Sequence, residues 1–170
     1  MNFPLGNIAF QRAPAYQTSV YSTWVATNAV DGDLGRCTHT MPVTDPWFIL
    51  DMRESVTVSS VAVTNRDGLE MRLDDFEIRV GNSFTTHGKV NEKCSGPNPG
   101  PLLTMTFACI GQPTGRYLSV HIYGDGRVLT ICELAVYGLF EEGEIKVVVV
   151  EPFNAVLVAL FYSHYLSRRL

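Results

Sequence analysis

The stretch WFILDMRESVTVSSVAVTN at residues 47–65 decides the fold class. Its two halves, 47–52 and 56–65, are rich in Val, Ile, Phe and Thr, which are residue types that favour strands. Four later segments share this composition: FEIRVG (76–81), LLTMTFAC (102–109), RYLSVHIYG (116–124) and VLTICELAVYG (128–138). The sequence therefore predicts six short strands across the middle of the chain.

Turn-forming residues separate these strands, in the segments DGDLG, RDG, SGPNPGP, GQPTG and GDG. They supply the positive or fixed φ that turns need. No segment between residues 7 and 138 carries a sustained apolar period of 3.6 residues, so crossover helices are not expected. Strands without such helices pair antiparallel. The predicted fold class is all-β, an antiparallel sandwich or barrel.

The composition limits the classes of function. The chain has 170 residues, enough for one domain with a sizeable core and an appendage. Hydrophobic residues make up 46% and charged residues 18%, which is not a disordered composition. The formal net charge is −4 and the basic residues are scattered, whereas a phosphate-backbone binder needs a basic face. Nucleic acid is therefore not an expected partner.

Four widely spaced cysteines, with no C-x-x-C pair, argue against a zinc ribbon or a thioredoxin-type redox site. Two disulfides in an oxidising compartment are favoured, with three pairings open, and four reduced thiols in the cytosol are the alternative. The N-terminal MNFPLGNIAF lacks the pattern of a signal peptide. The chain is therefore either cytosolic or begins at a domain edge without its leader.

The composition changes after Gly138. Residues 139–170 are charged at first and then strongly apolar between Val147 and Tyr162. A transmembrane helix needs roughly 20 apolar residues, and here Glu151, Pro152 and Asn154 interrupt a shorter run. A membrane span is therefore less favoured than an added β-hairpin, an interfacial helix or an erroneous extension of the coding sequence.

Polar residues that could converge on a ligand lie in CTHT (37–40) and VTNRDGLEMRLDDFEIRVG (63–81). His39, Arg66 and Arg72 form a set rich in hydrogen-bond donors, with Asp67 as the acceptor. Such a set suits a hydroxyl-rich neutral ligand, because arginine's rigid fork can bridge vicinal hydroxyls. No nucleophile has a base beside it, and no carboxylate pair is placed for glycosidic cleavage. The pattern favours binding over catalysis.

The order of these motifs closely resembles the F-type lectins, or fucolectins, over roughly residues 7–138, which gives a predicted lectin domain at 1–138. The resemblance implies an eight-stranded β jelly roll that binds L-fucose and holds a structural calcium ion. The family motif is a histidine, 26 residues, an arginine, one residue, an aspartate, four residues, and an arginine or lysine. His39 and Arg66 match the first spacing, and Asp67 and Arg72 match the last.

The chain departs from the motif in one loop. Asp67 follows Arg66 directly, where the family has a residue between them, and Gly68-Leu69 stands where the family usually has two adjacent cysteines. The resemblance implies a fucose clamp with Leu69 as an apolar surface. The implied sugar-binding residues are His39, Arg66, Arg72, Asp67 and Leu69.

The resemblance also implies a calcium site and the disulfide pairing. Calcium prefers six to eight oxygen ligands. The implied metal residues are Asn28, Asp31 and Asp33 in the first loop, and Cys132 with Glu133 in the second. Arg36 replaces the serine that usually precedes the cysteine of CTHT. The implied bridges are Cys37–Cys132 and Cys94–Cys109.

Further expectations concern the core and the wider function. Trp24, Trp47 and Phe48 are expected in the core. The resemblance implies a secreted protein that recognises fucosylated glycans, with innate defence as its role and a homo-oligomer such as a trimer as its assembly. Two other functions remain open, since jelly rolls of this type host several. One is a degenerate discoidin-like domain for protein or membrane interaction, and the other is the binding module of a sugar-active enzyme.

Overall fold

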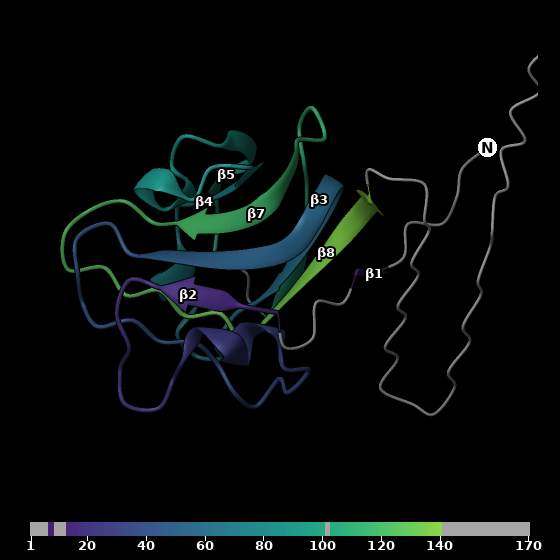
Figure 1. Ribbon diagram of the computed structural model, residues 1–170. Helices are drawn as coiled ribbons and strands as arrows, with labels where there is room; N and C mark the ends of the chain where they lie inside the picture. Colours follow the sequence, from purple (N-terminus) through teal and green to yellow (C-terminus); the bar gives the residue numbers. More distant parts are fainter. Residues whose placement is uncertain (1–6, 9–12, 101–102, 141–170) are drawn as a thin grey trace, which may run out of the picture.

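The computed structural model of the chain describes residues 7–8, 13–100 and 103–140, which form eight strands and three short 3-10 helices (Figure 1). Every strand pairing is antiparallel, so the predicted fold class is confirmed. The predicted strands 47–52 and 56–65 are one continuous strand, β3, from Trp47 to Thr64. The C-terminal segment 141–170 and the ends of the predicted domain at 1–6 and 9–12 lie outside the described residues.

Strand β3 belongs to both layers of the sandwich. Its first half lies between β2 (Ala15–Gln17) and β7 (Thr114–His121), and β7 continues to β4 (Phe76–Gly81) and β5 (Glu92–Asn98). Its second half lies between β6 (Thr104–Ala108) and β8 (Glu133–Phe140), and β8 pairs with β1 (Asn7–Ile8). The register shifts between Asp51 and Val56, and Arg53 there has a φ of 65°. Figure 1 shows β3 as a long curved strand that passes from one layer to the other.

The core fills the space between the two layers. Phe48, Leu50 and Met52 from the first half of β3 are fully or almost fully buried. Across the core, the rings of Phe76 in β4 and Phe107 in β6 meet edge to face at 5.0 Å. This contact joins the two layers directly, and such aromatic pairs add stability beyond their buried area.

Two expectations about strands were wrong. The segment SGPN was predicted as part of a turn, yet it ends β5. Strand β5 is the last of its sheet, and an edge strand tolerates the missing N–H of Pro97. The predicted strand at 128–138 begins only at Glu133 and continues to Phe140, two residues past the expected domain end at Gly138. Strand β2, which was not predicted, covers the free side of the first half of β3.

The predicted core positions of the aromatic residues are partly confirmed. Phe48 has no exposed surface. Trp47 is half-buried and stacks on His87 at 4.2 Å, on the outer side of its sheet. Trp24 is also half-buried, and it lies in the loop that follows β2. The expectation that all three rings belong to the core was therefore wrong for Trp47 and Trp24.

Candidate functional site

The CTHT segment runs beside residues 129–131, and its two threonines fix it there. The N–H groups of Thr38 and Thr40 donate to the carbonyls of Ile131 and Leu129, at 2.7 and 3.1 Å. Their hydroxyls accept from the N–H groups of the same two residues, at 3.0 and 2.9 Å. The N–H groups of residues 129 and 131 thus bond to threonine hydroxyls instead of backbone carbonyls. For this reason residues 128–132 of the predicted strand 128–138 do not form a regular β-ladder.

His39 lies between the two threonines. Its backbone forms hydrogen bonds with the segment of Tyr21 and Trp24, on the side away from residues 129–131. Its N–H donates to the carbonyl of Trp24 at 3.1 Å, and its carbonyl accepts from the N–H of Tyr21 at 2.9 Å. The side-chain amide of Gln17 donates to the carbonyls of Trp24 and His39, both at 3.1 Å. Two aromatic rings therefore lie against the imidazole: Tyr21 at 4.7 Å and Trp24 at 5.8 Å between centroids.

Both nitrogens of the His39 ring have partners. Nδ1 lies 2.7 Å from the carbonyl of Thr40, and Nε2 lies 2.8 Å from Nη1 of Arg72. A carbonyl can only accept and a guanidinium can only donate, so this arrangement requires a neutral imidazole with its proton on Nδ1. Burial lowers the pKa of His39 below its ordinary 6.5, and the charges of Arg72 and Arg66 lower it further against the Thr40 carbonyl. His39 thus orients Arg72 as an acceptor.

Arg66 is placed by the residue before it. Asn65 is buried, and its side-chain oxygen accepts from the N–H of Arg66 at 2.8 Å. Its side-chain amide donates to the carbonyl of Glu70 at 3.1 Å, so one side chain holds both ends of the loop. Gly68 supplies the positive φ of the turn, 71°. The guanidinium of Arg66 then lies 4.6 Å from the ring centre of Trp24, a cation–π contact.

Arg72 and Leu69 are placed by the short 3-10 helix Glu70–Leu73 (η2). Leu73 is fully buried and fixes the helix to the core. The N–H of Arg72 donates to the carbonyl of Leu69 at 3.0 Å, which closes the turn. Both side chains thereby reach the pocket, whereas Met71 between them is 74% exposed.

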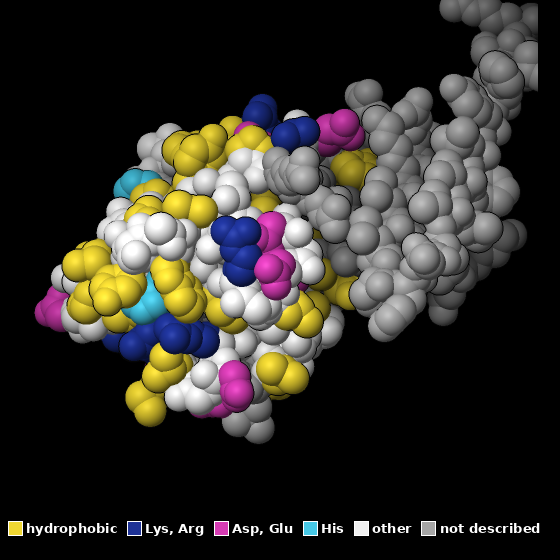
Figure 2. Space-filling view, turned by 90° about the horizontal axis from the view of Figure 1, so that it is seen from below, with side chains coloured by type: hydrophobic (Ala, Val, Ile, Leu, Met, Phe, Trp, Pro, Cys, Tyr) yellow, Lys and Arg dark blue, Asp and Glu magenta, His cyan; other side chains and the backbone are white. Residues whose placement is uncertain are grey.

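These segments surround a pocket of about 420 Å³. Four of the five predicted sugar-binding residues line it: His39, Arg66, Leu69 and Arg72. Asp67 is exposed and is not among the lining residues. Figure 2 shows, at one end of the face seen from below, Lys or Arg side chains and hydrophobic side chains gathered around a histidine. The lining residues that the sequence did not predict are Tyr21, Trp24, Pro42 and Val128.

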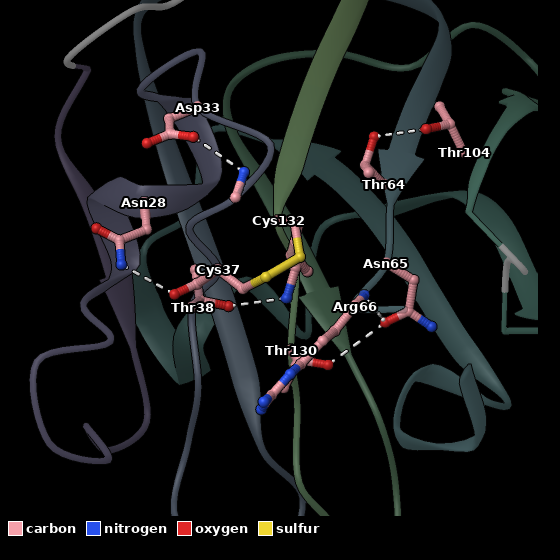
Figure 3. Close-up of a disulfide and its surroundings, with 12 residues drawn as sticks. Asn28, Asp33, Cys37, Thr38, Thr64, Asn65, Arg66, Thr104, Thr130 and Cys132 are labelled. Carbon is pink, nitrogen blue, oxygen red and sulfur yellow. Dashed lines mark hydrogen bonds between the residues drawn. A yellow bond between two sulfur atoms is a disulfide. The ribbon is translucent and has the colours of Figure 1, made fainter. Parts of the chain in front are cut away.

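The two predicted disulfides are present. Cys37–Cys132 joins the CTHT segment to the start of β8, and Figure 3 shows it between Asn28 and Asp33 on one side and Arg66 on the other. The carbonyl of Cys37 accepts from the side chain of Asn28 at 2.9 Å. The bridge therefore connects the pocket to the loop that carries the predicted metal residues.

Three carboxylates among the predicted metal residues, two in that loop and one at the start of β8, accept hydrogen bonds from backbone N–H groups. Asp31 accepts from Asp33 and Asp33 from Gly35, each at 2.9 Å, and Glu133 accepts from Gly32 at 3.1 Å. The described residues contain no group of three His, Cys, Asp or Glu side chains that could hold a metal.

Two of these carboxylates still suit a cation. Burial raises the pKa of Glu133 to about 7, the charge of Asp31 adds to this, and the N–H of Gly32 opposes it. A divalent ion favours the ionised forms and would relieve the repulsion. The guanidinium of Arg36 lies 3.7 Å from Asp31 and already supplies part of that positive charge. The negative charges of Asp31 and Glu133 therefore suit a calcium ion, and the guanidinium of Arg36 would compete with the ion for Asp31.

Comparison with known proteins gives one matching family model and several similar chains. Residues 28–120 match the F5/F8 type C family described as a NedA-like, galactose-binding domain. The chain is 36% identical to pentraxin fusion protein of Xenopus laevis over 145 residues, which is 77% of this chain and 33% of that protein. It is 32% identical to fucolectin of Anguilla anguilla over 119 residues, 65% of this chain and 75% of that one.

A solved structure agrees with these relatives. An F-lectin (fucolectin) from the serum of striped bass, Morone saxatilis, superposes with a TM-score of 0.72 at 36% identity. The match covers 78% of this chain and 47% of that one, so this chain spans about half the length of the bass lectin and a third of the Xenopus protein. Because the eel and bass relatives are lectins, the prediction of a binding domain rather than an enzyme is confirmed.

Proposed function

Because this chain belongs to the fucolectin family of F-type lectins, we propose that its pocket binds L-fucose in fucosylated glycans. The observation that carries the proposal is the convergence of His39, Arg66 and Arg72 from two separate segments on one pocket of about 420 Å³. Pockets of a few hundred Å³ with a small number of placed polar groups are typical of small-molecule sites.

The chemistry of the lining suits a deoxy sugar. The guanidinium groups of Arg66 and Arg72 are donors, and sugar hydroxyl oxygens accept such charge-assisted hydrogen bonds. L-Fucose is a 6-deoxyhexose and so also presents a methyl group and apolar C–H surface. Leu69, Val128 and the Tyr21 ring give the pocket an apolar wall against which that surface can pack.

A glycan array probed with the purified chain tests the proposal. We expect signal on glycans with terminal fucose and competition by free fucose. Signal on galactose- or glucose-terminated glycans that free fucose does not displace would contradict it. Absence of all glycan signal at high protein concentration would instead favour the alternative, a discoidin-like domain for protein or membrane interaction.

Fucose affinity is expected to depend on pH through His39. As the pH falls below the ordinary histidine pKa of 6.5 and approaches the lowered pKa of His39, the ring gains a second proton. A protonated ring loses the acceptor for Arg72 and repels both arginines. Affinity measured by calorimetry should therefore be flat from pH 8 to about 6.5 and fall in more acid buffer.

The stability of the folded chain should fall with decreasing pH, as the fucose affinity does. Because the folded chain binds fewer protons at His39 than the unfolded chain does, the free energy of unfolding also falls as the pH drops through this range. His39→Gln should bind fucose more weakly than the unchanged chain, but without this pH dependence. An acid loss of affinity that persists in His39→Gln would contradict the role given to the imidazole.

We also propose that calcium binds beside the disulfide, with oxygens of Asp31 and Glu133 as ligands and with Asn28, Asp33 and Cys132 completing the site. When bound, the ion would neutralise the two neighbouring carboxylates and fix the first loop to the start of β8. Such a site stabilises the folded state, because a ligand that binds only the native chain contributes about 2.7 kcal/mol at a hundred times its Kd.

Calcium is therefore expected to raise the unfolding midpoint by several degrees, with EDTA reversing the effect. Arg36→Ser removes the competing guanidinium, so its midpoint should respond at lower calcium concentration. Glu133→Gln should lose the response. Thermal melts over a calcium titration, with magnesium as the control, measure this. A midpoint insensitive to calcium in both the unchanged chain and Arg36→Ser would contradict the site.

Secretion and a role in recognising fucosylated surfaces, as in innate defence, complete the proposal. Two disulfides suit an oxidising compartment. No helix among the described residues is both long and apolar enough to cross a membrane. A homo-oligomer, such as a trimer, would raise avidity for clustered glycans.

A further inference from the structure

The pocket has an unbalanced charge. Its lining includes Arg66 and Arg72 but no carboxylate. In the part of the chain that the structure describes, no Asp or Glu forms an ion pair with either arginine. Arg79, Lys89, Lys93 and Arg116 differ, since each has a carboxylate partner. The two pocket arginines thus differ from these four cations in having no carboxylate partner among the described residues.

The acidic residues of the same loop do not balance this charge. Asp67 directly follows Arg66, but its side chain is exposed and does not line the pocket. Glu70 bonds to the N–H of Gly68 at 3.1 Å and is likewise not among the lining residues. With these two carboxylates outside, the side chains of the pocket offer few acceptors.

His39 adds no acceptor either. Its Nε2 accepts from Arg72 and its Nδ1 faces the carbonyl of Thr40, so both ring nitrogens have protein partners. Apart from the Tyr21 hydroxyl, the polar side-chain groups of the pocket are donors. A ligand with strong acceptor atoms therefore complements it better than one with hydroxyls alone.

Arg66 has hydrogen-bond donors available for such a ligand. Its guanidinium carbon lies over the Trp24 ring, 4.6 Å from the ring centre. A cation–π contact uses none of the hydrogen-bond acceptors of the protein, so the N–H groups of Arg66 still need a partner, and a bidentate one suits them best. None of the described residues accepts a hydrogen bond from these N–H groups. Planar or tetrahedral oxyanions are the groups that this fork recognises best.

We propose that the preferred ligand of this pocket is a fucosylated glycan that carries an oxyanion, a sulfate ester or a carboxylate, on or next to the fucose. This inference rests on the proposed fucose site and specifies its substrate class. The fucose ring takes the site formed by His39, the two arginines and the apolar wall, and the oxyanion takes the N–H groups of Arg66 that the fucose leaves unused.

Calorimetry of the intact chain with three probes tests this: methyl fucoside, its sulfate ester, and a sialylated, fucosylated oligosaccharide. The anionic probes should bind about ten- to a hundredfold more tightly than the neutral one, since hydrogen bonds to charged groups are the stronger kind. The advantage should shrink as sodium chloride is raised, because the pocket is open to solvent. The two anionic probes distinguish a sulfate from a carboxylate source.

Matched variants locate the effect. Arg66→Met keeps the unbranched start of the side chain but removes the charge and the N–H groups. It should weaken binding of every fucoside and bring the anionic and neutral ones to equal affinity. Arg66→Lys keeps the charge and should retain a preference. Asp67→Asn changes a neighbouring charge outside the pocket and should leave the ratio of affinities unchanged.

The outcomes separate this inference from the one on which it rests. Equal affinity for the neutral and both anionic fucosides would overturn the anionic preference and leave fucose binding intact. Equal binding of a sulfated sugar without fucose would overturn the inference as well, because the site would then be a general anion site. Failure of every fucoside to bind would overturn the proposed function itself.

Discussion

Arg72→Ala is expected to weaken fucose binding by about 30-fold or more, since central charged residues of a binding site typically contribute ~2 kcal/mol or more. In the proposed site Arg72 donates to the ligand, and in the structure it is also the partner of His39, at 2.8 Å. Its removal also leaves Nε2 of the imidazole without its hydrogen-bond donor. The unfolding midpoint should stay within a few degrees, because half-exposed clamp residues contribute little to stability.

Met71→Ala is the matched control for this variant. Met71 precedes Arg72 in the same 3-10 helix, but its side chain is 74% exposed and lies outside the pocket. Fucose affinity and midpoint should both be unchanged. Calorimetry and thermal melts on the two variants measure the difference. Normal fucose affinity of Arg72→Ala would show that the shortened loop does not place this guanidinium on the sugar.

Removing the Cys37–Cys132 bridge is expected to be the most destabilising change. The bridge closes a loop of 95 residues, for which the chain-entropy model gives about 4–5 kcal/mol. The double variant Cys37→Ala/Cys132→Ala should therefore lose that much free energy of unfolding in a denaturant titration. It should also weaken fucose binding, because the bridge holds the segment that carries His39 against residues 129–131.

The second disulfide serves as the control for the first, because it lies away from the pocket. Cys94–Cys109 closes a loop of 15 residues and joins β5 to the end of β6, away from the residues that line the pocket. Cys94→Ala/Cys109→Ala should cost about 3 kcal/mol and leave fucose affinity unchanged. If both double variants lost affinity equally, the link between the first bridge and the pocket would be wrong. Unfolding unaffected by either change would contradict the stabilising role of both.

Patterns along the chain predicted the strands and missed the features that depend on neighbours. The strands around Phe48 and Phe76 were predicted because β-branched and aromatic residues cluster there. Strand β5 was missed because its SGPN ending favours turns, and only its place at the sheet edge permits Pro97. Trp24 was assigned to the core because nothing in the local sequence indicates that Arg66 will stack on it.

Some features of the site could likewise be predicted from the sequence, and others could not. The sequence by itself determined the all-β class, the two arginines and the histidine, and, through family resemblance, both disulfides. Spacing identifies these residues because a family motif is a pattern along the chain. Only the tertiary structure decided that Leu69 enters the pocket while Asp67 faces solvent, and that His39 accepts from Arg72. Which way a side chain points depends on contacts between segments far apart in sequence, here the hydrogen bonds of Asn65 across the loop and of Thr38 and Thr40 to residues 129–131.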